Sequence, residues 1–342
     1  MMDGQFTKLR SLGRSGLKLS GLGFGGSRVG NLYGPVAEDD AAQAIGTAYT
    51  AGLRYFDTAP LYGNGLGELR MGQALAARPR GEYVLSTKVG RLLEPLPAGR
   101  EPDPADAHRL SFQIKYDYSY DGVMRSLDDS LGRLGMDRID IALIHDIDPH
   151  NQADDQGQRF REAMEGAFPA LAELRDKGAI TAIGVGVNDW QVCSDCLAAA
   201  DFDCFLLAGR YTLLEHEALR TFLPVCEARG VGLIIGAPYN SGILARGAVG
   251  GATYFDGPPP PPIVEKVNRM AQIAKTHNVS LAAAALRFPL AHPVVASVLP
   301  GTRSAADIKR TLALFDEVIP GDLWSELKHE GLIDAEAPVP AS

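Results

Sequence analysis

Short hydrophobic runs alternate along the chain with longer segments in which hydrophobic residues recur every three or four positions. Runs of the first kind are typical of buried β-strands, and segments of the second kind are typical of amphipathic helices. Regular alternation of the two predicts parallel strands joined by helices that cover the sheet. We expect eight strands, which lie within residues 19–26, 53–59, 83–90, 140–146, 179–188, 203–210, 232–239 and 294–301.

Eight amphipathic segments follow these strands. In the third segment, Val123, Leu127, Leu131 and Leu134 fall on one face of a helix, and Gly135 is a helix stop. Eight βα units predict an α/β protein with a closed (β/α)8 barrel, the TIM-barrel fold. The helical segments cover residues 38–52, 66–78, 121–135, 161–178, 190–201, 216–230, 264–278 and 305–318.

The chain is longer than such a barrel requires. It has 342 residues, whereas about 250 are typical of this fold. The surplus is therefore expected in long loops at the C-terminal face of the barrel. Three segments offer room for it, after the third, fourth and seventh strands: residues 90–120, 146–160 and 244–262.

Residues 8–20 predict an N-terminal hairpin that closes the barrel floor, with Gly13 and Gly16 at its turn. No linker divides the chain, so we expect one domain over residues 1–342. Its barrel core would cover about residues 18–318, followed by an acidic, proline-containing C-terminal tail at 319–342.

The composition fits an ordinary soluble protein, with 46% hydrophobic and 22% charged residues. A net charge of −9 without a basic cluster argues against binding to nucleic acid or to an anionic membrane surface. No hydrophobic segment approaches the length of a membrane span, and the first residues lack the apolar core of a signal peptide. We therefore expect a cytoplasmic protein.

The four cysteines are too few and too clustered for a secreted disulfide framework. Cys193 and Cys196 form a C-x-x-C pair, but no second pair of zinc-ligand spacing accompanies them, and their surroundings predict a helix. We expect all four, Cys193, Cys196, Cys204 and Cys226, to be structural thiols, and no metal site.

Polar residues stand where the predicted strands end. They are Asp57, Lys88, His145 and Asn188, and Tyr62 lies in the loop after the second strand. In a βα barrel the C-terminal strand ends converge on one face, where active sites are built. A carboxylate after a buried strand is costly unless it is paired, and Lys88 on the neighbouring strand predicts that partner for Asp57.

This grouping predicts acid–base chemistry at Tyr62. An ammonium beside a phenol favours the phenolate, so Lys88 would lower the pKa of Tyr62, while Asp57 keeps the lysine charged and in place. His145 can hydrogen-bond the oxygen that Tyr62 protonates or deprotonates. Each residue alone would more often be structural, but four of them at consecutive strand ends indicate a functional site.

The order and spacing of Asp57, Tyr62, Lys88 and His145 resemble the catalytic tetrad of the aldo-keto reductases. Residues 52–75, "GLRYFDTAPLYGNGLGELRMGQAL", are similar to the signature of that superfamily, and the resemblance extends over nearly the whole chain. It implies a (β/α)8 barrel that binds a nicotinamide dinucleotide in extended form without a Rossmann fold. The glycines of "GLGFGG" do have the spacing G-x-G-x-x-G, but no acidic ribose-binding residue follows them in a βαβ context, so the segment does not indicate a Rossmann fold.

Segments 117–135, 206–216 and 237–244 look most like the aldose 1-dehydrogenases. That resemblance implies oxidation of the C1 hemiacetal of L-fucose, L-galactose, D-arabinose or a similar sugar to the lactone. Some closely similar enzymes oxidise pyridoxal to 4-pyridoxolactone, which is the same chemistry on another cyclic hemiacetal. A general aldehyde reductase and a nonenzymatic regulatory subunit are the remaining alternatives.

The resemblance also implies which residues hold the dinucleotide. Asn188 matches the asparagine that binds the nicotinamide carboxamide, although Val187 replaces the usual preceding serine. Ala208, beside Arg210, and Gly236 stand where the family commonly has a glutamine and a stacking tyrosine, so Pro238 or Asn240 is a candidate in their place. The full candidate set is Gly26, Asp57, Asn188, Arg210, Pro238, Asn240, Gly242, Gly301, Thr302, Arg303 and Asp307.

Residues 299–311 resemble the adenosine-phosphate loop of the family and predict NAD rather than NADP. Gly301 and Asp307 occupy positions where NADP-binding members typically place a lysine and an arginine. A carboxylate at 307 would repel a 2′-phosphate and could accept a hydrogen bond from a free 2′-hydroxyl. Arg303 argues in the opposite direction, for NADP, because a guanidinium binds phosphate well.

Two further expectations concern the surroundings of the site. Phe24, Leu61, Tyr116 and Tyr239 are candidate walls of the substrate pocket. The proline tract 258–262 is interpreted as a stiff spacer in the loop over the cofactor, in preference to a polyproline II ligand. The expected partner is a small-molecule substrate, and the sequence leaves the oligomeric state open.

Overall fold

The computed structural model describes residues 5–101 and 103–341 of the chain. Eight parallel strands form one sheet in the order β12-β11-β10-β9-β8-β5-β4-β3, as the sequence predicts. Parallel bridges from Leu22 to Val298 and from Gly25 to Gly301 join its two ends, so the sheet closes into a barrel. The strands are β3 (Phe24–Gly25), β4 (Tyr55–Asp57), β5 (Val84–Val89), β8 (Ile141–His145), β9 (Ala182–Val187), β10 (Cys204–Ala208), β11 (Gly232–Gly236) and β12 (Val295–Leu299).

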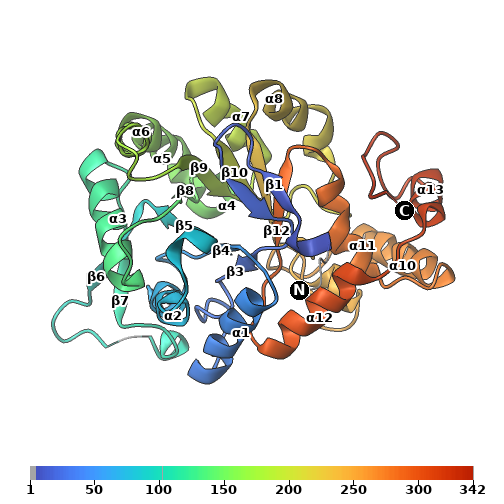
Figure 1. Cartoon of the computed structure of the whole chain (residues 1–342), viewed down its shortest axis with the longest axis horizontal. Coiled ribbons are helices and arrows are strands. Elements are labelled where there is room, and N and C mark those ends of the chain that lie inside the picture. The colour runs from blue at the N-terminus through green and yellow to red at the C-terminus, as the bar shows by residue number, and fades with distance from the viewer. Residues whose placement is uncertain (1–4, 102, 342) are drawn as a thin grey trace.

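The predicted N-terminal hairpin covers one end of this barrel. Strands β1 (Leu9–Ser11) and β2 (Lys18–Ser20) pair antiparallel, and Gly13 and Gly16 in the turn have positive φ angles of 52° and 80°. Leu12 and Leu19 are fully buried against residues of the barrel interior, among them Tyr55, so the hairpin packs as a plug. Figure 1 shows it in front of the central strands.

Helices form the outer ring around the strands (Figure 1). Helix α3 shows why they form, because Ser119 caps its N-terminus, Val123 and Leu127 are buried, and Gly135 ends it with a φ of 62°. The ring contains α1 (Glu38–Thr50), α2 (Leu66–Leu75), α3 (Tyr120–Leu134), α5 (Gln156–Glu162), α6 (Phe168–Asp176), α7 (Trp190–Ala199), α8 (Phe222–Arg229), α10 (Pro261–Thr276), α11 (Leu281–Arg287) and α12 (Ala305–Asp316).

The three long segments are more regular than the sequence indicates. Residues 90–120 contain an antiparallel hairpin of β6 (Arg91–Pro95) and β7 (Phe112–Tyr116). The segment after β8 begins with α4 (Pro149–Gln152), and the segment after β11 begins with α9 (Ile243–Arg246).

Residues 258–260 of the proline tract lie in the loop before α10, whereas the rest of the tract belongs to the helix. Pro261 and Pro262 form the first turn of α10, where a missing backbone N–H costs nothing.

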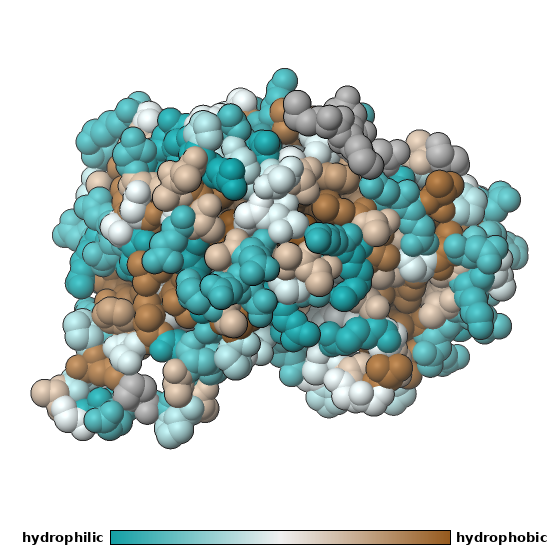
Figure 2. All heavy atoms as spheres, turned by 60° about the horizontal axis from the view of Figure 1, so that its bottom comes forward, coloured by the Kyte–Doolittle hydropathy of each residue, from teal (hydrophilic) through white to brown (hydrophobic). Residues whose placement is uncertain are grey.

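The C-terminal segment packs onto the barrel. Helix α13 (Gly321–His329) lies against α10 and buries Leu323, Trp324 and Leu327 in the main hydrophobic core. On the face shown in Figure 2, hydrophilic residues separate the hydrophobic ones into small patches. Within the described residues, every helix is too short or too polar to cross a membrane.

Candidate active site

The four predicted catalytic residues meet at the C-terminal end of the barrel. Asp57 is the last residue of β4, Lys88 lies one residue before the end of β5, and His145 is the last residue of β8. These three strands are neighbours in the sheet. Tyr62 lies in the loop between β4 and α2.

Asp57 and Lys88 form the buried ion pair that the sequence predicts. Lys88 Nζ lies 2.8 and 3.0 Å from the two carboxylate oxygens, and it also donates to the carbonyl of Thr58 at 2.9 Å. The hydroxyl of Ser86 donates to Asp57 Oδ1 at 2.6 Å. These bonds offset the cost of burying two charges and hold the ammonium in one place.

The ammonium of Lys88 lies 4.8 Å from the centre of the Tyr62 ring. Its charge lowers the pKa of Tyr62, as expected, but burial and the nearby Asp57 carboxylate raise it. The net result is a pKa of about 12, above the ordinary value of 10.0. The expectation of a lowered pKa is therefore wrong for the protein without ligand, because desolvation outweighs the lysine.

His145 lies against Tyr62, with the two rings edge to face and their centres 6.3 Å apart. Burial, together with the positive charges of Arg91 and Lys88, holds the pKa of His145 well below its usual range. The imidazole is therefore neutral at neutral pH and carries one N–H. Its Nδ1 atom is buried without a hydrogen-bond partner among the described residues.

The loop that carries Tyr62 is anchored directly after the tyrosine by the β6–β7 segment. Asn64 donates to the carbonyls of Leu110 and Phe112, at 3.1 and 2.9 Å, in the β6–β7 segment. The N–H of Leu110 donates back to the carbonyl of Gly63 at 3.1 Å. The segment inserted after β5 thus fixes the two residues that follow Tyr62, Gly63 and Asn64.

A cavity of about 630 Å³ reaches the C-terminal strand ends of the barrel, although none of the four predicted catalytic residues lines it. Gly25, which lines it, pairs with Asp57 in the barrel, and Asn188, which also lines it, directly follows β9. The far end is bounded by the N-terminal part of α12. A volume of this size suits an extended small-molecule ligand or cofactor.

A model of the aldo/keto reductase family matches residues 21–329 of the chain. The chain belongs to this family. It is therefore an oxidoreductase of the aldo-keto reductase type, and enzymes of this type use nicotinamide cofactors.

Individual relatives cover almost the full length. Pyridoxal 4-dehydrogenase of Microbacterium luteolum is 43% identical over 335 residues, which are 95% of this chain and 97% of that protein. D-threo-aldose 1-dehydrogenase of a Pseudomonas species is 37% identical over 326 residues, 93% and 96% of the two chains. The solved structure of aldo-keto reductase AKR11C1 from Bacillus halodurans in its holo form superposes with a TM-score of 0.71 at 25% identity, covering 96% and 97%.

The cavity fits the nicotinamide dinucleotide that aldo-keto reductases use. Four arginines and the first turn of α12 contribute to its lining, together with two aspartates, and arginines and a helix N-terminus are groups that bind phosphate. The predicted cofactor residues that line it are Asn188, Pro238, Asn240, Gly242, Gly301, Arg303 and Asp307.

Four predicted cofactor residues lie outside that lining, namely Gly26, Asp57, Arg210 and Thr302. Gly26 lies so close to the β4 backbone that only glycine fits there. A Cβ atom at this position would stand 2.7 Å from the carbonyl oxygen of Asp57. Arg210 donates to the carbonyl of Asn188 at 2.7 Å, so it supports that residue from behind.

The side-chain amide of Asn240 is occupied by hydrogen bonds within the protein. Its amide donates to the carbonyl of Gly209 at 3.0 Å, and its oxygen accepts from Thr212 at 2.7 Å. Asn240 can therefore offer a cofactor little beyond its backbone.

Asp307 is not the free carboxylate that the sequence argument assumed. It lies in the first turn of α12, where it accepts from the backbone N–H of Arg303 at 3.3 Å and contacts Arg310 at 3.2 Å. Ser304 accepts from the N–H of Asp307 at 3.1 Å, which completes a reciprocal cap. Two guanidinium groups thus stand beside the acid in the same cavity.

Of the candidate pocket walls, Tyr239 lines the cavity, whereas Phe24 packs against Phe56 in the core. Tyr116 stacks on Tyr118 at 6.3 Å, under the guanidinium of Arg91.

Arg91 and Asp146 were not predicted as site residues from the sequence. They form a buried ion pair directly beside His145. The sequence contains only a weak indication of them. Arg91 follows Lys88, and Asp146 follows His145, by only a few positions.

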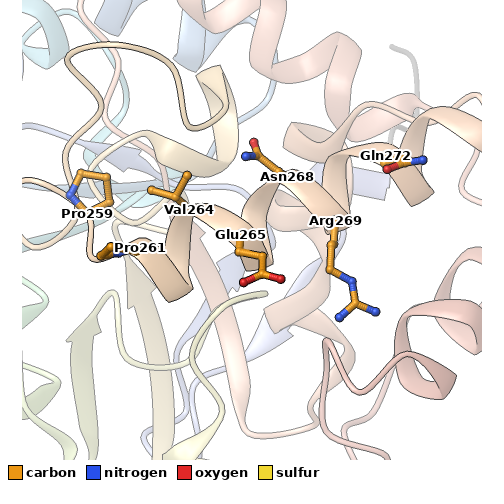
Figure 3. Close-up of a pocket in the computed structure, with 7 residues that line it drawn as sticks. All are labelled: Pro259, Pro261, Val264, Glu265, Asn268, Arg269 and Gln272. Atoms are coloured by element: carbon orange, nitrogen blue, oxygen red, sulfur yellow. The ribbon is translucent and has the colours of Figure 1, made fainter.

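Neither the cysteines nor a second cavity adds to this site. All four cysteines are buried, and burial raises their pKa values, as expected of structural thiols. Among the described residues, no group of three or more His, Cys, Asp or Glu side chains is placed to hold a metal ion. Figure 3 shows the second cavity, about 520 Å³, which lies along α10 and is lined by Pro259, Pro261, Val264, Glu265, Asn268, Arg269 and Gln272.

Proposed function

We propose that this protein is a nicotinamide-dependent dehydrogenase that oxidises the C1 hemiacetal of an aldose, such as L-fucose, L-galactose or D-arabinose, to the lactone. The observation that carries the proposal is the grouping of Asp57, Lys88, Tyr62 and His145 at the C-terminal end of the barrel. Similarity to D-threo-aldose 1-dehydrogenase supports the substrate class.

The four side chains divide the work of removing a proton from a hydroxyl. Tyr62, as phenolate, accepts the proton of the hemiacetal O–H. Lys88 stabilises that phenolate, and Asp57 holds the ammonium in place. Neutral His145 orients the reacting oxygen through a hydrogen bond. A bound oxidised nicotinamide supplies the acceptor for the hydride that leaves the same carbon.

Pyridoxal is the second candidate substrate. Its cyclic hemiacetal presents the same hydroxyl and hydrogen on one carbon, and the identity to pyridoxal 4-dehydrogenase, 43%, exceeds the 37% to the aldose enzyme. The product would be 4-pyridoxolactone.

Absorbance of reduced nicotinamide tests both candidates. Purified protein is incubated with NAD or NADP and a panel of L-fucose, L-galactose, D-arabinose and pyridoxal, and we expect reduction of the dinucleotide with at least one of them. The variant Tyr62→Phe keeps the ring but loses the proton acceptor, so turnover should fall at least 100-fold while dinucleotide binding is retained. If the wild type binds the dinucleotide but reduces it with no substrate of the panel, the proposed function is contradicted. Reduction of open-chain aldehydes alone would instead favour a general aldehyde reductase.

We expect NAD to be preferred over NADP. The Asp307 carboxylate repels a 2′-phosphate, and the adjacent Arg303 and Arg310 moderate that repulsion, so the preference should be modest. Steady-state kinetics with both dinucleotides measures it. Asp307→Arg should shift kcat/KM towards NADP, and Asp307→Asn controls for the lost charge while keeping an oxygen to cap α12. A kcat/KM for NADP equal to or above that for NAD contradicts the expectation.

A further inference from the structure

We propose that Asp146, held by Arg91, is a positioning residue that keeps the neutral ring of His145 in the form with its proton on Nε2. The inference deepens the proposed function, on which it rests, because it concerns the group assigned there to orient the substrate oxygen. It adds two residues, 55 positions apart in the sequence, to the reaction centre.

The contact between the two side chains carries the argument. His145 Nε2 lies 3.4 Å from Asp146 Oδ2, and the same oxygen accepts a hydrogen bond from Arg91 Nη2. All three residues are only 6% exposed, so water screens the contact little. The contact is electrostatic: at 3.4 Å a nitrogen lone pair is repelled by the carboxylate, whereas an N–H is attracted. The single proton of the neutral imidazole therefore belongs on Nε2, which leaves the lone pair on Nδ1.

The backbone around Asp146 holds it in this place. Its φ of 53° is left-handed, a region that aspartate visits more readily than most residues other than glycine. The N–H of Asp146 donates to the carbonyl of Gly186 at 2.9 Å, and its carbonyl accepts from Gln152 at 2.6 Å and from Tyr118 at 3.3 Å. Three hydrogen bonds thus aim the carboxylate at His145 and Arg91.

The surrounding charges determine how the pair responds to pH. Burial and Asp148 raise the pKa of Asp146, while Arg91 and Lys88 lower it, and the result is about 6. The pKa of His145 stays well below its usual range. The phenols of Tyr33 and Tyr118, which also interact with this carboxylate, have raised pKa values and stay neutral. When pH falls through about 6, Asp146 is therefore protonated while His145 remains neutral, and the preference for Nε2–H is lost.

Long-range ¹H–¹⁵N spectra of the histidine rings test the tautomer directly in the whole protein. The chain has seven histidines, and His145→Gln identifies the signal of interest. At pH 7.5 the wild type should show Nε2–H at His145. The double variant Arg91→Gln/Asp146→Asn replaces the ion pair by neutral amides, so it buries no unpaired charge, and it should lose this preference. Predominant Nδ1–H in the wild type, or an unchanged spectrum in the double variant, overturns the inference.

The variant Arg91→Gln gives a second spectroscopic readout. It removes the positive charge that lowers the pKa of Asp146, so the pH at which the Nε2–H signature disappears should move upward from about 6. A transition at the wild-type pH would contradict a role for Arg91.

Kinetics distinguish positioning from a general structural effect. With the best hemiacetal substrate, Arg91→Gln/Asp146→Asn should lower kcat by roughly 10- to 100-fold. This loss is smaller than the full rate contribution of a general acid or base, because His145 itself remains in place. In a His145→Gln background the same change should have little further effect, because it acts through the imidazole. Equal losses in both backgrounds would overturn the inference. Failure of every substrate would count against the proposed function, while the spectra would still decide the tautomer.

Discussion

The Lys88–Asp57 pair links stability and reactivity at a single contact. Both side chains are almost fully buried, at 2% and 4% exposure, and each is the main counter-charge of the other. Replacing one partner leaves the other charge without compensation, which typically costs about 3–5 kcal/mol. The same replacement removes the cation that favours the Tyr62 phenolate.

Lys88→Met should therefore be inactive and less stable. We expect the free energy of unfolding, measured with urea, to fall by about 3–5 kcal/mol. Lys88→Met/Asp57→Asn is the matched control, since it removes both charges and should recover part of the stability but none of the activity. An unchanged unfolding midpoint in Lys88→Met would show that the two charges do not depend on each other.

The pKa of Tyr62 predicts the pH dependence of oxidation. The phenolate is the active form, and with a pKa of about 12 its population rises tenfold per pH unit throughout the range below that value. The logarithm of kcat/KM for the hemiacetal substrate should therefore increase with a slope close to one between pH 7 and 10. Initial rates in overlapping buffers of constant ionic strength measure this slope. A plateau reached below pH 8 would mean that Tyr62 titrates much lower than its burial implies.

At the residue scale, the sequence predicted which side chains meet but not their electrostatics. Asp57, Lys88 and His145 could be placed because each stands at the end of a hydrophobic strand run. The upward shift of the Tyr62 pKa could not be predicted, because the desolvation comes from packing of segments distant in sequence. Arg91 and Asp146 were missed for the same reason, since nothing local indicates their pairing.

At the scale of elements, all eight barrel strands were predictable, because parallel strands buried on both faces are continuous hydrophobic runs. The hairpin of β6 and β7 was not. The first three residues of β6 are buried, but every residue of β7 is at least partly exposed, and the segment between them contains prolines and charged residues, so residues 90–120 resemble a loop. Its contacts with the Tyr62 loop nevertheless make it part of the support of the active site.

Asn64 tests this support. Asn64→Gly removes two hydrogen bonds to the hairpin but tolerates the φ of 54°, so the unfolding free energy should fall by about 1–3 kcal/mol. Asn64→Ala should cost about 1 kcal/mol more, because alanine is strained in this conformation. Both variants should also lower kcat by loosening the Tyr62 loop. Urea unfolding and steady-state kinetics check these effects, and a wild-type kcat in both variants would show that the hairpin does not position Tyr62.

At the scale of the whole molecule, the barrel core was predicted to end near residue 318, with a tail beyond it. The hydrophobic core does not end there. Leu323, Trp324, Leu327, Leu332 and Ile333 are at most 4% exposed and belong to the same cluster as the barrel helices. The sequence concealed this because the segment is short, acidic and rich in proline.

The last prediction follows from the packing of α13. Trp324 is 1% exposed, and its ring lies 6.3 Å from that of Phe288, centre to centre. Trp324→Ala leaves a large cavity and should lower the free energy of unfolding by about 3–5 kcal/mol, as typical for an aromatic residue in a core. Ser325→Ala, at the exposed neighbouring position, should change it by about 0.5 kcal/mol or less. Urea unfolding of the full chain compares the two. If Trp324→Ala unfolds at the same urea concentration as Ser325→Ala, α13 does not contribute to the stability of the barrel and the segment is a dispensable tail, as the sequence suggested.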